Sequence, residues 1–143
     1  MKPILSIITL LIVTSFTIKT YAQDIKLKKD FVIVDGEQKF QYEKRSSATE
    51  FTLYSLDKDK EILTIIRNKG GTAGYSYDDY VQLIFTDYNV RVESVRFKGY
   101  SFKWFIELLL KEKVLNPDGS IDEQKLQTFF TKYDENVTNR TIR

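Results

Sequence analysis

Short runs of β-branched and aromatic residues, separated by turn signals, predict antiparallel strands between residues 31 and 97. The clearest turn is Asp35-Gly36, because both residues tolerate the positive φ angles of a tight hairpin. Phe40 and Tyr42 then alternate with polar residues, which predicts a strand near a sheet edge with one face in the core. Further strands are expected at 51–56, 61–67, 79–85 and 90–97.

Three of these predicted strands, 51–56, 61–67 and 79–85, are apolar on both faces. This pattern is typical of central strands that are covered on each side by other elements. We therefore expect the middle of the sheet to be buried on both faces.

After Gly99 the hydrophobic period changes from two residues to about 3.6, which predicts a helix. Trp104 and Leu108 widen its apolar stripe, so we expect the helix to be sandwiched or to meet a partner. Ser120 and Glu123 form an S-x-x-E capping box that predicts a second helix. The apolar stripe of this second helix is expected to pack across the sheet, and it consists of Leu126, Phe129, Phe130 and Tyr133.

The predicted fold class is therefore α+β: an antiparallel β-meander of about five or six strands followed by two C-terminal α-helices. No internal repeat or proline-rich linker divides the chain. We expect a single α+β domain at 23–143.

Residues 1–22 have the pattern of an export signal peptide, with Lys2, an apolar run and small residues before the expected cleavage point. A retained membrane anchor is the alternative. A membrane span requires about 20 apolar residues, whereas Lys19 ends this run early. We therefore expect an exported protein, periplasmic or secreted, with no membrane span after signal cleavage.

The signal peptide changes the charge balance of the domain. The whole chain has 22 Lys and Arg against 20 Asp and Glu, and the two charges in the signal are Lys2 and Lys19. The mature chain is thus formally neutral and lacks the basic footprint of a nucleic-acid binder. Lys98–Phe105 matches an RNA-recognition pattern in part, but its aromatic residues are expected to open a helix. We expect no nucleic-acid partner.

Missing residue types exclude several kinds of chemistry. The chain contains no His and no Cys, which excludes disulfides, Ser-His-acid triads, Cys-His nucleophiles and zinc sites built on these residues. The turn around Asp118 lacks the first and last acidic ligands of a calcium loop, so no metal or cofactor is predicted. Carboxylate chemistry is still open, and its candidates are Asp78, Asp79, Asp87 and Glu93.

The glycine- and tyrosine-rich stretch from Asn68 to Tyr80 predicts a long connection between two strands. Such loops often carry binding residues, and Tyr75, Tyr77 and Tyr80 are candidates to contact a glycan, another small ligand or a partner. The alternative is that Tyr77 and Tyr80 begin the next strand and pack on the sheet.

The signal ending in TYAQ, the VDG hairpin, the KVLNPDGSID turn and the KLQTFFTKYDENVTNR helix resemble small exported proteins of Bacteroidota bacteria that carry no assigned activity. The resemblance covers most of the mature chain. It implies a Gram-negative periplasmic or secreted location and implies no catalytic residue.

These observations lead to three hypotheses. The first is a non-catalytic protein-binding module of the cell envelope, such as an inhibitor or immunity protein, that uses Trp104, Leu108 and the outer sheet face. Formation of a homodimer would hide the same surface. The second is a glycan- or small-ligand-binding protein that uses Tyr75, Tyr77, Tyr80 and Trp104. The third is a carboxylate-dependent hydrolase.

Overall fold

The computed structural model describes residues 22–69 and 77–140. The predicted signal peptide therefore lies outside the described residues, apart from Ala22, and so does Tyr75. No helix among the described residues is long and apolar enough to cross a membrane.

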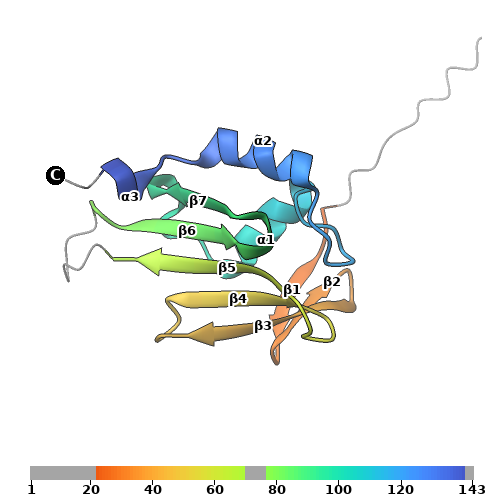
Figure 1. The fold of residues 1–143 in the computed structure, drawn as a ribbon. Helices are drawn as coiled ribbons and strands as arrows, with labels where there is room; N and C mark the ends of the chain where they lie inside the picture. Colours follow the sequence, from red (N-terminus) through yellow and green to blue (C-terminus); the bar gives the residue numbers. More distant parts are fainter. Residues whose placement is uncertain (1–21, 70–76, 141–143) are drawn as a thin grey trace, which may run out of the picture.

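Seven strands form one antiparallel sheet in which every strand pairs with the next along the chain (Figure 1). This confirms the predicted antiparallel meander and adds one strand. The strands are β1 (Ile25–Lys28), β2 (Phe31–Val34), β3 (Glu37–Arg45), β4 (Glu50–Ser55), β5 (Glu61–Asn68), β6 (Tyr80–Phe85) and β7 (Val90–Ser94).

The extra strand, β1, changes the place of β3 in the sheet. Ile25 of β1 pairs with Val34 of β2, while Lys26 and Lys28 lie outward and exposed. The strand was not predicted because its four residues, Ile25–Lys28, include two lysines and only two apolar side chains. Because β2 pairs with β3 only over Glu37–Gln41, the prediction that β3 runs near an edge is wrong for its first half and confirmed for Glu43–Arg45, which pair with β4 alone.

Two turns set the ends of strands, and the sequence predicted the first turn but not the second. Asp35 and Gly36 have φ angles of 51° and 84°, which confirms the tight hairpin between β2 and β3. The predicted strand 90–97 ends early, because Ser94 caps a short 3-10 turn (η2, Val95–Phe97) by accepting a hydrogen bond from the Arg96 N–H at 3.1 Å.

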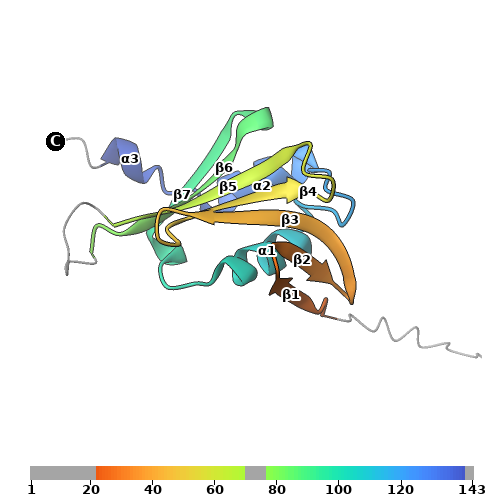
Figure 2. The same ribbon diagram turned by 90° about the horizontal axis from the view of Figure 1, so that it is seen from below.

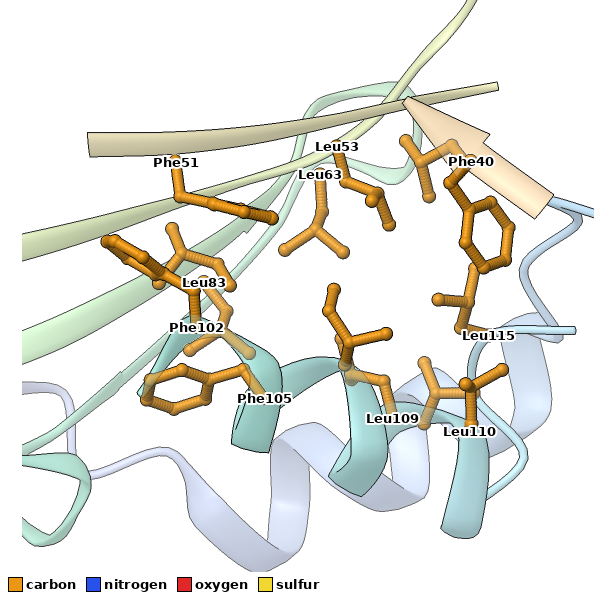
Figure 3. Packing of buried hydrophobic residues seen from close by; sticks show 14 of the residues in the cluster. Phe40, Phe51, Leu53, Leu63, Leu83, Phe102, Phe105, Leu109, Leu110 and Leu115 are labelled. Carbon is orange, nitrogen blue, oxygen red and sulfur yellow. The ribbon is translucent and has the colours of Figure 1, made fainter. Parts of the chain in front are cut away.

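One face of the sheet packs against the first helix, α1 (Phe102–Lys111). Figure 2 shows that the sheet curls around this helix, with the β1–β2 hairpin at its far side. A row of inward side chains crosses four strands and is fully buried; it consists of Phe51, Ile65, Leu83 and Val92. Figure 3 shows Phe102, Phe105 and Leu109 of α1 facing this layer. The core therefore lies between α1 and the concave face of the sheet.

The second helix, α2 (Glu123–Tyr133), runs beside β7 at the edge of the sheet (Figure 1). The prediction that it packs across the sheet is wrong, because α1 already fills the concave face. Its end is tied to α1, since Lys132 Nζ and the Tyr133 hydroxyl donate to Glu112 Oε1 at 2.7 and 2.9 Å. A short final helix, α3 (Val137–Arg140), follows.

The predicted capping box does not form. Asp122 caps α2 instead, because its Oδ1 accepts a hydrogen bond from the Lys125 N–H at 3.0 Å. Ser120 is used in the preceding turn, where its N–H and hydroxyl donate to Asp118 at 2.9 and 2.6 Å. The turn therefore competes for the serine and leaves the next acidic residue to cap the helix.

We predict that Asp122→Ala lowers the free energy of unfolding by about 1 kcal/mol, the usual cost of losing a helix N-cap. Asp122→Asn should retain nearly full stability because asparagine caps equally well. Urea unfolding of both variants measures the effect. Equal destabilisation by the two changes would contradict the assignment of the cap.

Candidate functional site

The face of the sheet that points away from α1, here called the outer face, is lined by side chains in two cross-strand rows. Strand register places Glu43, Thr52, Thr64, Ile84 and Arg91 in one row and Arg45, Glu50, Ile66, Gln82 and Glu93 in the next. The outer face is thus mainly polar. It contains two isoleucines near its centre.

The outer face is only partly covered. Among the described elements, the C-terminal stretch from Phe130 onward reaches this face at β6 and β7, whereas no helix lies over β3, β4 and β5 (Figure 2). The prediction that central strands are covered on both faces is therefore wrong. Tyr54, Ile66 and Ile84 are half-buried there because neighbouring side chains in the sheet shield them.

A buried carboxylate anchors the C-terminal stretch to the sheet. Glu93 of β7 is 4% exposed, and its carboxylate accepts hydrogen bonds from Gln82 Nε2 at 2.6 Å, the Thr138 N–H at 2.8 Å and the Thr138 hydroxyl at 2.7 Å. Its main chain is also engaged: the Glu93 N–H donates to Asp134 Oδ1 at 2.9 Å, and the Glu135 N–H donates to the Glu93 carbonyl at 2.7 Å.

Glu135 makes a second anchor next to the first. Its carboxylate accepts hydrogen bonds from the Ser94 hydroxyl and from the Val95 N–H, the latter at 2.7 Å. Burial would raise the pKa of Glu135, but these hydrogen bonds outweigh it and lower the pKa. The two glutamates together hold the segment after α2 against the end of β7.

The same balance acts on Glu93. Burial opposes ionisation, but the hydrogen bonds from Thr138 and Gln82 outweigh burial and hold the pKa of Glu93 below its ordinary value. A general acid in glycoside hydrolysis needs a raised pKa. The geometry of Glu93 therefore fits an anchoring role better than proton donation.

The other three candidate carboxylates are spread along the sheet. Asp78 and Asp79 precede β6, whereas Asp87 follows it and pairs with Lys60 at 3.4 Å. A six-residue strand such as β6 spans roughly 20 Å. Glycosidase carboxylates lie about 5 to 10 Å apart, so Asp87 cannot pair with Asp78 or Asp79 for this chemistry.

A groove of about 480 Å³ lies between the β6–β7 edge and the C-terminal stretch. Its apolar part comes from Ile84 of β6 and from Phe130 of α2, which is 36% exposed. Its polar part comes from Asn89, Arg91, Asp134, Asn136, Thr138 and Asn139. The guanidinium of Arg91 lies 3.9 Å from Glu93 Oε1. We call this hollow the β7 groove.

The tyrosines predicted as site residues are placed differently from one another. Tyr77 lies in the turn before β6 and is 82% exposed. Tyr80 begins β6 on the outer face, half-buried, with its hydroxyl oxygen 3.4 Å from Thr138 Oγ1. Tyr80 therefore belongs to the sheet and its C-terminal cover, as the alternative interpretation expected, whereas Tyr77 does not pack into it.

Trp104 and Leu108 lie on α1, on the concave side of the sheet, and pack against the core. The Trp104 ring stacks on Tyr100 with a centroid distance of 3.8 Å and meets Phe97 and Phe105 edge-on. The fold therefore does not bring Trp104 and Tyr80 into one site. The wide apolar stripe of α1 is used mainly within the domain.

The β7 groove was not predicted from the sequence. Phe130 falls on the apolar stripe of α2 and was expected in the core, yet it lies partly exposed beside the groove. A usable signal was Glu93 between the apolar residues of β7, because a glutamate in such a strand needs partners from elsewhere.

Comparison with known protein families, curated proteins and solved structures found no match. Within residues 22–69 and 77–140, no group of acidic side chains is arranged to hold a metal ion. The two surfaces of the described residues that suit binding are the outer face and the β7 groove.

We predict that Glu93→Gln lowers the free energy of unfolding by about 2 kcal/mol at pH 7, because the hydrogen bonds from Thr138 and Gln82 lose their charged acceptor. The folded pKa is lowered, so this stabilisation is present above the ordinary glutamate pKa of about 4.3 and is lost as the pH falls through the folded value. The difference between wild type and variant should narrow in acid.

Urea unfolding of both proteins from pH 7 to pH 3 measures this difference. Glu50→Gln on the same row is the control and should change stability by less than about 0.5 kcal/mol. A difference between wild type and Glu93→Gln that stays constant down to pH 3 would show that the charge of Glu93 is not what anchors Thr138.

Proposed function

We propose that this chain is an exported, non-catalytic protein-binding module of the periplasm or the extracellular space, with an inhibitor or immunity-type role as its concrete form. The observation that carries the proposal is the outer face of β3, β4 and β5, over which no described helix lies. The export pattern of residues 1–22 and the resemblance to exported Bacteroidota proteins support the location.

The composition of the outer face suits a protein partner. Tyr54 and Ile66 lie among small polar side chains such as Thr52 and Thr64, whose hydroxyl oxygens are 3.0 Å apart. Interfaces between proteins typically combine aromatic and aliphatic side chains at the centre with a polar rim. The centre of this face therefore offers apolar contact without an unpaired buried charge.

Charged residues lie to one side of this centre and are paired with each other. Glu43 accepts hydrogen bonds from Arg45 at 2.8 Å and from Lys58. Charges at the rim of an interface change the association rate and its salt dependence more than the affinity. Trp104 and Leu108 pack on the core, so the proposed partner contacts the outer sheet face and not these two residues.

The test is a pull-down of tagged residues 23–143 from the envelope fraction of the host, with mass spectrometry of the bound proteins. We predict a stoichiometric partner that Ile66→Arg at the centre of the outer face removes, because a charge would be buried against the partner. Gln127→Arg, on the exposed side of α2, is the matched control and should retain the partner.

Sedimentation velocity of the same proteins completes the test. Loss of the partner with Gln127→Arg as well, or recovery of the bait alone, would count against the proposal. A tight wild-type dimer that Ile66→Arg dissociates would show that a second copy covers the outer face, and the partner hypothesis would lose its basis.

Glycan or small-ligand binding is the second candidate function, and the observation in its favour is the exposed ring of Tyr77. We predict that Tyr77→Ala changes stability by less than about 0.5 kcal/mol. Trp104→Ala should cost roughly 2 kcal/mol or more, since it removes three ring contacts.

Thermal unfolding and a glycan-array measurement on both variants check this alternative. Ligand binding that disappears with Tyr77→Ala at an unchanged melting temperature would support the second function. A glycan that binds equally well to wild type and Tyr77→Ala would exclude Tyr77 as its contact.

A further inference from the structure

The open edge of β7 has main-chain groups that point into the β7 groove. The Glu93 N–H and C=O bond to Asp134 and Glu135, so they point away from β6. In an antiparallel pair, residues two apart point their main-chain groups the same way. The register has no bulge between Glu93 and Arg91, so the N–H and C=O of Arg91 also point away from β6.

Among the described residues, the Arg91 N–H donates to no acceptor and the Arg91 C=O accepts from no donor. The segment after α2 occupies the edge at Glu93 but leaves it at Arg91, where the groove opens. Main-chain groups at a strand edge form a template for another extended chain. The edge of β7 is therefore occupied by the C-terminal stretch at Glu93 and open at Arg91.

An apolar side chain lies next to this open position. It is not Ile84, which pairs with Arg91 from the β6 side and is therefore one strand further into the sheet. Phe130 lines the same groove from α2, which runs beside β7 (Figure 1). An extended chain hydrogen-bonded to Arg91 would lie on the side of β7 away from β6, about 5 Å from β7, and would place one of its side chains near Phe130.

We propose that the β7 groove binds a short extended peptide segment of a partner protein, which pairs with the N–H and C=O of Arg91 and places an apolar side chain against Phe130. This inference rests on the proposed protein-binding function and names the chemistry of one contact. The mode of recognition is strand addition to a sheet edge, in which main-chain bonds give affinity and side-chain pockets give selectivity.

A peptide matches this site better than a charged small molecule. One donor and one acceptor on the same residue complement the donor and acceptor of a peptide strand. The carboxylates of Glu93 and Asp134 are engaged in hydrogen bonds within the domain, so the groove does not offer a free acidic pair to a cation. The apolar contact with Phe130 adds the selectivity.

The experiment selects ligands from a displayed library of random linear octapeptides on immobilised residues 23–143. The best peptide is then synthesised and titrated into the ¹⁵N-labelled protein. We expect the amide hydrogen exchange of Arg91 to slow at least tenfold at saturation, because its N–H gains an acceptor. Phe130→Ala should weaken binding at least tenfold, whereas Gln127→Ala on the exposed side of α2 should leave binding unchanged.

A second ligand tests the main-chain contact without changing the protein. N-methylation of the peptide nitrogen that pairs with Arg91 should abolish binding, since the donor is removed. No enrichment of peptides, enrichment that leaves the Arg91 amide unchanged, or groove signals that respond to neutral oligosaccharides instead would each overturn the inference.

The two proposals fail separately. A stoichiometric partner that is lost with Ile66→Arg but retained with Phe130→Ala would support the protein-binding function and overturn peptide capture by the β7 groove. Peptide binding that slows exchange at Arg91, in a chain that recovers no envelope partner, would support the groove and count against the wider function.

Discussion

Burial of one face of the sheet against α1 is the interaction on which the rest of this structure depends. The chain has no cysteine, so no disulfide can substitute for packing. The concave face supplies a fully buried layer that includes Phe51 and Leu83, and α1 supplies Phe105 and Leu109. Burial of apolar area is the main favourable term in folding. With α1 on the concave face, α2 lies at the edge of the sheet beside β7, and the outer face is lined mainly by polar side chains.

The position of α2 in turn creates the β7 groove. A helix packed beside an edge strand does not hydrogen-bond to the outward N–H and C=O groups of that strand, so these groups need other partners. At Glu93 these partners are Asp134 and Glu135, and the Glu93 side chain adds Thr138. A buried carboxylate is costly unless several donors satisfy it. The three hydrogen bonds to Glu93 meet that condition and join the C-terminal stretch to β6 and β7. The main-chain groups of Glu93 are thus hydrogen-bonded to the C-terminal stretch, whereas those of Arg91, two residues earlier in β7, are not.

The functional hypotheses change once the side chains are placed. Trp104 entered as a candidate contact residue because α1 has a wide apolar stripe, yet its ring is stacked among Phe97, Tyr100 and Phe105. The candidate carboxylates have different surroundings, since Glu93 anchors the C-terminal stretch through its hydrogen bonds and Asp87 lies at the other end of β6 from Asp78 and Asp79. The surfaces that favour binding are the outer face and the β7 groove, and neither is made of residues from one stretch of chain.

The sequence by itself determined the elements whose causes are local. The tolerance of Asp35-Gly36 for positive φ angles made the β2–β3 hairpin predictable, alternation identified the faces of β3, and the change of period after Gly99 located α1. Tertiary structure decided the rest. Competition for Ser120 within its turn moved the cap of α2 to Asp122, and the filling of the concave face by α1 sent α2 to the edge and exposed Phe130. The partners of Glu93 are up to 45 residues away in the chain, and no local pattern encodes a contact between segments that far apart.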